Sequence, residues 1–485
     1  MLPFAVEDAN VSAVIAAYRS GTLMCRELTE VYLQRIKEHD PFLHSVICIH
    51  PDVLQEADRM DRYLKETGKL IGPLHGIPIM IKDNIGTADM PTTAGSLALQ
   101  DFVPETDAFI IQRLRDAGAL ILGKTNMHEF AIWGETISSI LGQTINPYDY
   151  TRTPGGSSGG SGAAVAASFC LGALGTDTVN SVRSPAASCS LVGIRPTLGV
   201  VSRSGIVPYS LSQDTAGPIA GCVEDASLIL GVIAGYDAED SLSVRDEVYH
   251  REDLFRKRTP DGLQGKRIGV LESFFGKEEK NKQVNEIVRK AVSKLEEAGA
   301  ELIPLNEEIN STELARNASI HLEEFREDLD AYLARYGKTA KYHSLLEIYE
   351  SGLTHPGVWE SIYKALFLTR YSDQYGMKLR RQGLMRGKII SLMDKYNLDV
   401  IVFPHQQQLA CEIGMSQKQR NGVLAAVTGF PSITVPAGFV ESEHAPVGVP
   451  VGLEMLGRPY SENLLVDCAY AYEQIYPVRR PPVLK

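Results

Sequence analysis

The chain has 485 residues, of which 44% are hydrophobic and 22% are charged, a composition typical of a folded globular protein and not of a disordered one. Sixty acidic residues against 48 basic ones give a formal net charge of −12, and no long run of Lys and Arg offsets this excess. A nucleic-acid partner is therefore not expected.

The seven cysteines are scattered and form no Cys-x-x-Cys pair, so neither a zinc site nor a disulfide framework is indicated. The first residues lack the basic and apolar parts of a signal peptide, and the longest small-apolar stretch, 163–175, is too short to span a bilayer. We expect a cytoplasmic protein without membrane contact. No linker or fixed-period repeat divides the chain, which predicts one domain over residues 1–485.

The first readable element is a short apolar strand at Ile77–Ile81, within the segment 76–84. It ends at Lys82. A lysine at the end of a strand is more commonly a solvated terminus than a catalytic group. A helix–strand unit follows, in which Thr106 and Asp107 are expected to cap a helix and 119–123 is predicted to be a buried strand.

A Gly/Ser run occupies residues 155–162. Pro154 and an Ala-rich helical stretch flank it closely, which disfavours a flexible linker. The Gly-Lys-Ser/Thr ending of a phosphate loop is absent. Residues 155–159 also satisfy the G-x-S-x-G pattern of α/β-hydrolases, with His405 or His444 as the histidine to be tested. A polar loop at 146–154 stands where that fold needs a strand, but the alternative stays open.

Residues 175–186, taken alone, have the pattern of a polar loop. A second α/β unit begins after Gly265, with strands at 267–271 and 301–305 around an amphipathic helix. Further strands are expected at 399–404 and 432–437. Strands that alternate with helices predict an α/β fold, with a sheet covered by helices on both faces. Residues 310–397 are charged, aromatic and helical in pattern, and we expect them to form a helical insertion over the sheet.

Three of these segments together resemble the amidase signature family of serine hydrolases: the Lys82 segment, the Gly/Ser run and the 175–186 loop. They occur in the family's order, and the likeness is strong over about 72–235, weaker near 428–454, and slight in the insertion. The resemblance implies a single large mixed sheet flanked by helices, with the insertion shaping the substrate pocket. It calls for no metal and no organic cofactor.

By motif position, the resemblance assigns the nucleophile to Ser181, the bridging serine (after a cis peptide bond) to Ser157, and the base to Lys82. A serine hydroxyl is a weak nucleophile until a base takes its proton. Lysine accepts a proton only when neutral, which requires that burial lower its pKa. Ser157 then relays the proton from Ser181 to Lys82, and later to the leaving amine.

The resemblance also implies an oxyanion hole made of backbone N–H groups, together with supporting residues and pocket residues around the triad. The family commonly has two glycines before the nucleophile, whereas this chain has Val179 and Asn180, which puts the size of the substrate in doubt. The residues implied are Thr178, Val179, Asn180 and Ser181 for the oxyanion hole, Ser158, Asp177 and Arg183 for support, and Met127, Trp133 and Tyr209 for substrate contact.

The predicted reaction is hydrolysis of a small-molecule linear carboxamide through a seryl acyl-enzyme. Two alternatives use the same triad: the glutamine-hydrolysing subunit of a tRNA-dependent amidotransferase, and a hydrolase of carbamates or urea derivatives. An acidic residue is expected before Thr428 in the glutamine-using subunits, but 417–422 has none, which disfavours glutamine. A catalytically inactive scaffold is disfavoured by the intact triad, and a homodimer is one assembly state left open.

Overall fold

The computed structural model describes residues 3–245 and 247–485. In this part of the chain, eleven strands form one mixed sheet, in the order β1-β3-β2-β6-β8-β7-β12-β13-β11-β9-β10. β2 runs parallel to β3 and β6, and β9 runs parallel to β10 and β11, while the other neighbours pair antiparallel. The strands are β1 (Val46–Ile49), β2 (Pro78–Lys82), β3 (Leu120–Thr125), β6 (Gly172–Asp177), β7 (Val192–Arg195), β8 (Thr215–Ala220), β9 (Arg267–Leu271), β10 (Glu301–Leu305), β11 (Val400–Pro404), β12 (Ser432–Ser442) and β13 (Ala445–Leu456).

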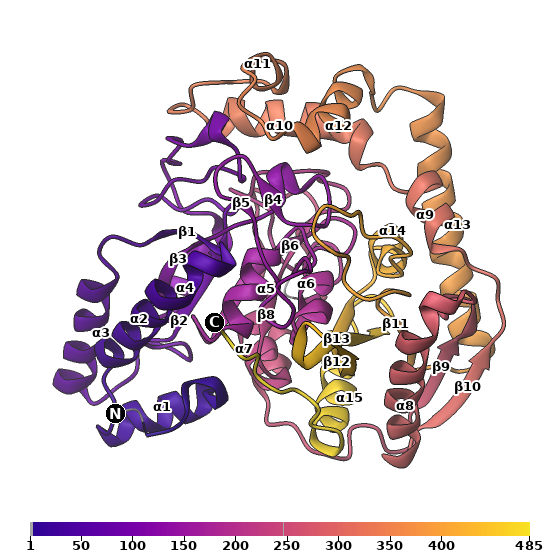
Figure 1. Cartoon of the computed structure of the whole chain (residues 1–485), viewed down its shortest axis with the longest axis horizontal. Coiled ribbons are helices and arrows are strands. Elements are labelled where there is room, and N and C mark those ends of the chain that lie inside the picture. The colour runs from indigo at the N-terminus through magenta and orange to yellow at the C-terminus, as the bar shows by residue number, and fades with distance from the viewer. Residues whose placement is uncertain (1–2, 246) are drawn as a thin grey trace.

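Helices cover both faces of this sheet (Figure 1). α5 and α6 pack against each other and against the middle strands, while α7, α15 and α8 pack in a row and cover several of the same strands from the other side. Strands β2, β3, β6 and β8 are consequently buried along their whole length, as expected for strands covered on two faces. The helices outside the insertion are α1 (Val11–Ser20), α2 (Cys25–Leu43), α3 (Val53–Thr67), α4 (Phe109–Asp116), α5 (Gly159–Ala166), α6 (Arg183–Ser188), α7 (Val223–Ile233), α8 (Lys282–Glu297), α14 (Val423–Thr428) and α15 (Glu462–Ile475).

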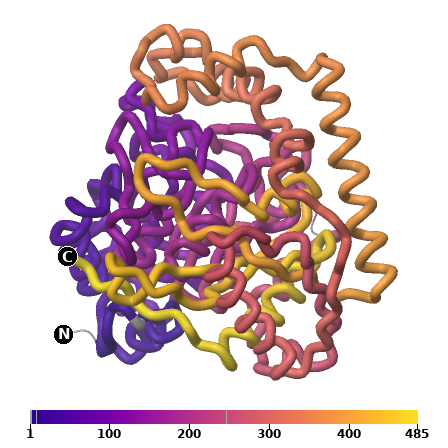
Figure 2. Tube along the Cα trace, turned by 45° about the vertical axis from the view of Figure 1, so that its right-hand side comes forward, coloured from indigo at the N-terminus to yellow at the C-terminus, as the bar shows by residue number. Residues whose placement is uncertain are grey.

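The segment 310–397 is helical, as predicted. α10 and α12 lie together at one end of the molecule, and α13 runs along one side (Figure 2). The apolar side chains under α10 and α12 form a cluster with residues of the segments 94–102 and 127–132, whereas α9 and α13 pack with β9, β11 and α14 in another cluster. Its helices are α9 (Ser311–Asn317), α10 (His321–Tyr336), α11 (Leu345–Glu350), α12 (Pro356–Phe367) and α13 (Asp373–Lys395).

The smaller elements add detail but do not change the architecture. β4 and β5 form a separate two-stranded ribbon. Within the described residues, no helix has the length and apolarity needed to cross a membrane. The short strands are β4 (Ile137–Ser138) and β5 (Gly142–Gln143), and the 3-10 turns lie at Val6–Asp8, Leu97–Leu99, Glu129–Ala131, Arg251–Phe255, Glu272–Phe274 and Glu279–Asn281.

The prediction of the cap of α4 was wrong. The helix begins at Phe109 with Ala108 at the cap position, and no side chain caps it. The Asp107 carboxylate instead accepts hydrogen bonds from the Ala88 N–H at 2.9 Å and from Arg115 Nε at 2.8 Å. Tertiary partners therefore compete successfully with the local capping preference of an aspartate.

Candidate active site

Lys82 lies at the carboxyl end of β2, beside the parallel strand β6. Parallel neighbours end at the same edge of a sheet, so Lys82 meets Thr176 near the end of β6. The Lys82 ammonium nitrogen Nζ lies 2.7 Å from Thr176 Oγ1, 2.8 Å from Ser157 Oγ and 3.4 Å from the Thr176 carbonyl oxygen. The side chain has no exposed surface. Its partners are thus neutral oxygens and not a carboxylate.

Burial lowers the pKa of Lys82 to about 7, because the buried surroundings disfavour the charged amine. The more distant carboxylates of Asp214 and Asp177 act in the opposite direction and limit the decrease. A lysine with this pKa is partly neutral at neutral pH. It can then accept a proton from the hydroxyl that it contacts.

Ser157 lies in the Gly/Ser run, just before α5, and the peptide bond between Gly156 and Ser157 is cis. Its carbonyl oxygen accepts a hydrogen bond from the His128 N–H at 2.9 Å. The next residue, Ser158, joins the run to β6: its Oγ donates to the Thr176 carbonyl at 3.2 Å and accepts from the Thr176 N–H at 3.3 Å. These bonds hold the two segments side by side.

Ser181 lies after the carboxyl end of β6, where its side chain is 5% exposed and lines a cavity of about 700 Å³. Its carbonyl oxygen accepts a hydrogen bond from the Ser158 N–H at 3.3 Å, so the backbones of the two serine segments are in contact. Within the described residues, no hydrogen bond joins Ser157 Oγ to Ser181 Oγ. The structure therefore brings Lys82 and Ser157 into direct contact and places Ser181 on the adjoining segment.

The backbone of the loop 178–181 is held by hydrogen bonds to its carbonyl groups, not by bonds from its N–H groups. Its four carbonyl oxygens all accept hydrogen bonds, whereas its four backbone N–H groups have no acceptor among the described residues. Unused N–H groups beside a nucleophile are the geometry required to receive a developing oxyanion. The donors to the carbonyls of Thr178, Val179, Asn180 and Ser181 are, in that order, Gln213 Nε2 at 3.2 Å, Arg183 Nη2 at 2.8 Å, the Ser184 N–H at 2.7 Å and the Ser158 N–H at 3.3 Å.

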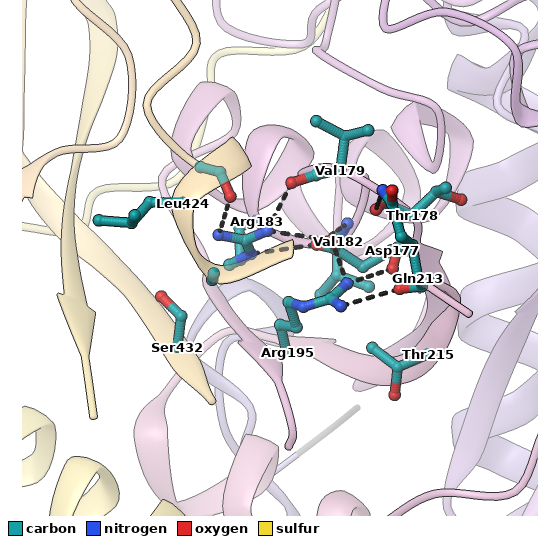
Figure 3. A network of polar contacts seen from close by, with 12 residues as sticks. Asp177, Thr178, Val179, Val182, Arg183, Arg195, Gln213, Thr215, Leu424 and Ser432 are labelled. Carbon is teal, nitrogen blue, oxygen red and sulfur yellow. Dashed lines mark hydrogen bonds and ion pairs between the residues drawn. The ribbon is translucent and has the colours of Figure 1, made fainter. Parts of the chain in front are cut away.

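A buried ionic network supports this loop from below (Figure 3). Arg183 binds Asp177 with two nitrogens, at 3.0 and 3.1 Å, and also donates to the carbonyl of Val179. Arg195 donates to the same carboxylate at 2.9 Å and to the carbonyl of Gln213 at 2.8 Å. All three charged side chains are fully buried. The loop is thus fixed by its carbonyl side, and its N–H side is left for a ligand.

Burial alone would raise the pKa of Asp177, but the charges of Arg183 and Arg195 outweigh it and hold that pKa well below its usual value. Arg183 also contacts Glu454 on β13, which in turn accepts from Ser432 Oγ at 2.6 Å and lies 2.6 Å from His405 Nδ1. His405 therefore belongs to the support under the loop and not to a Ser157 dyad, which removes the α/β-hydrolase interpretation for that histidine.

Sequence reasoning missed four residues of this site: Asn84, Thr176, Arg195 and Glu454. Asn84 Nδ2 donates to Thr176 Oγ1 at 3.0 Å, so it orients the hydroxyl that Lys82 contacts. Thr176 and Arg195 lie within motifs that carried the family resemblance, which is a usable signal. Glu454 is brought to the site by the pairing of β12 with β13, and it stands at the end of the weaker stretch of family likeness near 428–454.

Trp133 and Tyr209 line the cavity, whereas the structure does not bring Met127 to it. Met127 is fully buried in the cluster under the insertion. Side chains of the insertion form one wall of the cavity, and the segment around 416–420 forms another. Those from the insertion are Ser311, Thr312, Ala315, Arg316, Ser319, His321, Leu322 and Lys378.

Comparison with known proteins supports what the geometry indicates. The model of the family described as Amidase matches residues 27–466. The chain is 36% identical to a glutamyl-tRNA(Gln) amidotransferase subunit from Acaryochloris marina, over 96% of this chain and 98% of that protein. Among solved structures, it is similar to the peptide amidase of Stenotrophomonas maltophilia, with 38% identity, a TM-score of 0.89 and both chains fully covered.

The solved structure of the corresponding amidotransferase subunit from Thermotoga maritima is also similar, with 26% identity, a TM-score of 0.74 and both chains fully covered. The relatives with curated names thus favour the glutamine-hydrolysing alternative over the free-standing amidase that the sequence favoured. The chain belongs to the amidase family and is a hydrolase of amide C–N bonds.

Proposed function

We propose that this protein hydrolyses a primary carboxamide to a carboxylic acid and ammonia through an acyl-enzyme on Ser181. Ser181 Oγ attacks the amide carbon as its proton passes to Ser157, whose own proton passes to neutral Lys82. The tetrahedral intermediate then expels ammonia, which receives the proton back through Ser157. Water, activated along the same route, releases the acid and regenerates the serine.

The single observation that carries this proposal is the contact between Lys82 and Ser157. A fully buried amine with a pKa of about 7 lies 2.8 Å from a serine hydroxyl, on a segment that adjoins a second, cavity-facing serine. An amine that is only structural would be expected to lie against a carboxylate. Here the amine contacts hydroxyl and carbonyl oxygens.

The unpaired N–H groups of residues 178–181 support the second half of the mechanism. As the amide carbonyl becomes tetrahedral, its oxygen gains negative charge and needs donors that are already in place. The carbonyl groups of the loop are fixed by Arg183, Gln213 and two backbone amides, so the N–H groups do not have to reorganise during the reaction. Removal of one such donor typically lowers kcat by about 10²–10³-fold.

The cavity favours a substrate larger than free glutamine. Its volume of about 700 Å³ falls within the range of pockets for drug-sized ligands, which is about 300–1,000 Å³. Trp133 and Tyr209 offer it aromatic surface. The likeness to a peptide amidase is in keeping with a substrate of this size.

A glutamine-hydrolysing component of an amidotransferase is the second candidate, because the curated relatives carry that enzyme's name over nearly their whole length. Free glutamine presents an ammonium group, which needs an acidic partner. Among the residues that line the cavity in the described part of the chain, Glu278 is the one carboxylate, and Lys280 at 2.9 Å and Gln419 at 2.8 Å already engage it. Carbamates and urea derivatives suit the same triad and belong in the same screen.

The test is a parallel assay of aliphatic amides, aryl amides, anilides, carbamates and glutamine with the wild type and three variants. Ser181→Ala should abolish turnover of every substrate while the protein stays folded, and Ser157→Ala should lose most activity. Ser188→Ala is the matched control, because this serine is also buried and its hydroxyl has no hydrogen-bond partner among the described residues. If Ser157→Ala were inactive and Ser181→Ala nearly normal, the assignment of the nucleophile would be wrong.

Glutamine decides between the two candidates. We expect it to be a poor substrate compared with the better amides of the screen. Efficient release of ammonia from glutamine, or a stable complex with a tRNA-binding protein partner, would establish the amidotransferase candidate instead.

A further inference from the structure

Two cations that line the cavity make no hydrogen bond or ion pair through their side chains with the described residues: Lys418, which is exposed, and Arg420, which is partly buried. Three neighbouring cations are paired: Lys378 with Glu323 at 2.7 Å, Lys280 with Glu278 at 2.9 Å and Arg316 with Glu313 at 3.6 Å. A partly buried guanidinium presents five donors, and it is normally paired when solvent is partly excluded.

The position of Arg420 places its charge close to the reacting groups. A Cβ built on Gly134 would lie 2.6 Å from Arg420 Nη1, so the lack of a side chain at Gly134 is what admits the guanidinium. A Cβ built on Gly156 would in turn lie 2.9 Å from the Gly134 carbonyl oxygen. Gly134 therefore lies between the Arg420 guanidinium and Gly156, the residue that precedes Ser157.

A second unused donor lies on the same cavity wall. Asn180 is 1% exposed, and its Nδ2 has no hydrogen-bond partner among the described residues. Asn180 precedes Ser181 directly and also lines the cavity. A buried amide nitrogen without an acceptor is unfavourable by about 1–3 kcal/mol, so a ligand oxygen that completes it would gain affinity. Both unpaired groups are donors, and both line the cavity that Ser181 faces.

We propose that Arg420, assisted by Asn180 Nδ2, recognises a carboxylate on the acyl part of the substrate. The inference rests on the proposed function and names its substrate class: amides larger than glutamine that carry an anionic group without a free ammonium beside it, with monoamides of dicarboxylic acids as their small analogues. Guanidinium and carboxylate pair through two parallel hydrogen bonds, which gives both affinity and orientation. Glu278 already binds Lys280 and Gln419, so it does not offer a free carboxylate to an ammonium group of the substrate.

Three probes of similar chain length separate the charges. Glutaramate carries a carboxylate, pentanamide has a methyl group in its place, and glutamine adds an ammonium to glutaramate. For the wild type, kcat/KM for glutaramate should exceed that for pentanamide by about tenfold or more, and should also exceed that for glutamine. Equal kcat/KM values for glutaramate and pentanamide would overturn the inference. A higher kcat/KM for glutamine than for glutaramate would show that the site accepts an ammonium group, contrary to the inference.

Arg420→Gln should reduce the ratio of kcat/KM for glutaramate to that for pentanamide by at least about tenfold, and Arg420→Lys should retain part of that ratio. The matched control is Lys341→Gln, which removes one exposed charge that does not line the cavity and should keep the wild-type ratio. If Arg420→Gln kept the ratio as well, Arg420 would not be the carboxylate-binding residue.

Binding of glutarate to Ser181→Ala, measured by calorimetry, separates this inference from the proposed function because it needs no turnover. Arg420→Gln in that background should raise Kd by about tenfold or more. Hydrolysis of pentanamide without any Arg420-dependent binding of glutarate would leave the function standing and refute the inference. Arg420-dependent binding of glutarate without hydrolysis of any amide would refute the proposed function and leave the carboxylate-binding role of Arg420 standing. If neither hydrolysis nor Arg420-dependent binding were observed, both proposals would be refuted.

Discussion

Two buried lysines on neighbouring strands show how the partner decides what a buried amine can do. Lys82 on β2 and Lys124 on β3 lie one register position apart, and neither has any exposed surface. Lys124 Nζ donates to the Ile85 carbonyl at 2.7 Å and to Thr92 Oγ1 at 2.9 Å, and lies 3.9 Å from Asp83 Oδ1. Lys82 contacts Ser157 and Thr176 and has no carboxylate in contact. Burial lowers the pKa of both amines, but of the two only Lys124 forms an ion pair with a described residue.

The comparison teaches that burial by itself does not mark a base. A lysine beside a carboxylate is held as a structural cation, because the ion pair offsets part of the loss of hydration. A lysine that contacts hydroxyl groups lacks this ion pair, and for Lys82 the more distant Asp214 and Asp177 offset only part of the effect of burial. The two lysines should therefore fail in different ways when they are replaced.

The largest expected effect is the loss of catalysis in Lys82→Ala. Without the amine, nothing accepts the proton of Ser157, and kcat/KM should fall by about 10³-fold or more. Steady-state kinetics on the best amide of the screen measures this effect, with thermal unfolding as the check that the variant is folded. A variant with more than about a tenth of wild-type activity would remove Lys82 from the role of base.

Lys124→Met should instead affect stability. The change leaves Asp83 as a buried carboxylate without its cation, and we expect the free energy of unfolding to decrease by about 3 kcal/mol. Urea unfolding measures this change, and kcat per folded molecule should stay within about threefold of the wild type. If Lys124→Met lost activity as severely as Lys82→Ala while remaining folded, the contrast between the two lysines would be invalid.

The pH dependence of the wild type should reflect the Lys82 pKa of about 7. Lys82 accepts a proton only when neutral, and its neutral fraction increases as the pH rises. Below that pKa, kcat/KM should therefore increase about tenfold per pH unit, and it should level off above it. A profile that is flat from about pH 5 to about pH 9 would contradict a neutral lysine as the base.

The smallest effect is expected for Thr176→Val, which keeps the shape of the side chain but removes the hydroxyl that Lys82 Nζ contacts at 2.7 Å. That oxygen stabilises the ammonium form, so its loss should lower the Lys82 pKa further and move the acid limb of the profile to lower pH. We expect kcat to fall about fivefold to tenfold, because the amine is less well oriented. A shift of the limb to higher pH would show that Thr176 acts differently.

Sequence patterns predicted the fold class, the helical insertion and the segments that carry Lys82, Ser157 and Ser181. These features are local: each depends on periodicity or on a short motif. The support under the loop 178–181 is not local, because Arg195 and Glu454 reach Asp177 and Arg183 only through the order of strands in the sheet. No run of residues near Glu454 indicates that contact.

The cavity was the least predictable part, since its walls come from the insertion and from the segment before α14. Met127 illustrates the difficulty. It lies two residues after β3, in a segment that resembles the family, yet its side chain packs in the apolar cluster under the insertion. Arg420 shows the converse: nothing in its sequence neighbourhood indicates that its side chain makes no polar contact with the described residues.

The most direct test of the account is a site-resolved titration of the two buried amines by NMR of lysine labelled at its side-chain Cε, with Lys82→Met and Lys124→Met used to assign the signals. We expect the Lys82 signal to titrate near a pH of about 7, at the same pH as the acid limb of kcat/KM. A Lys82 amine that remains protonated to about pH 9 or above would contradict the claim that a neutral lysine starts the reaction.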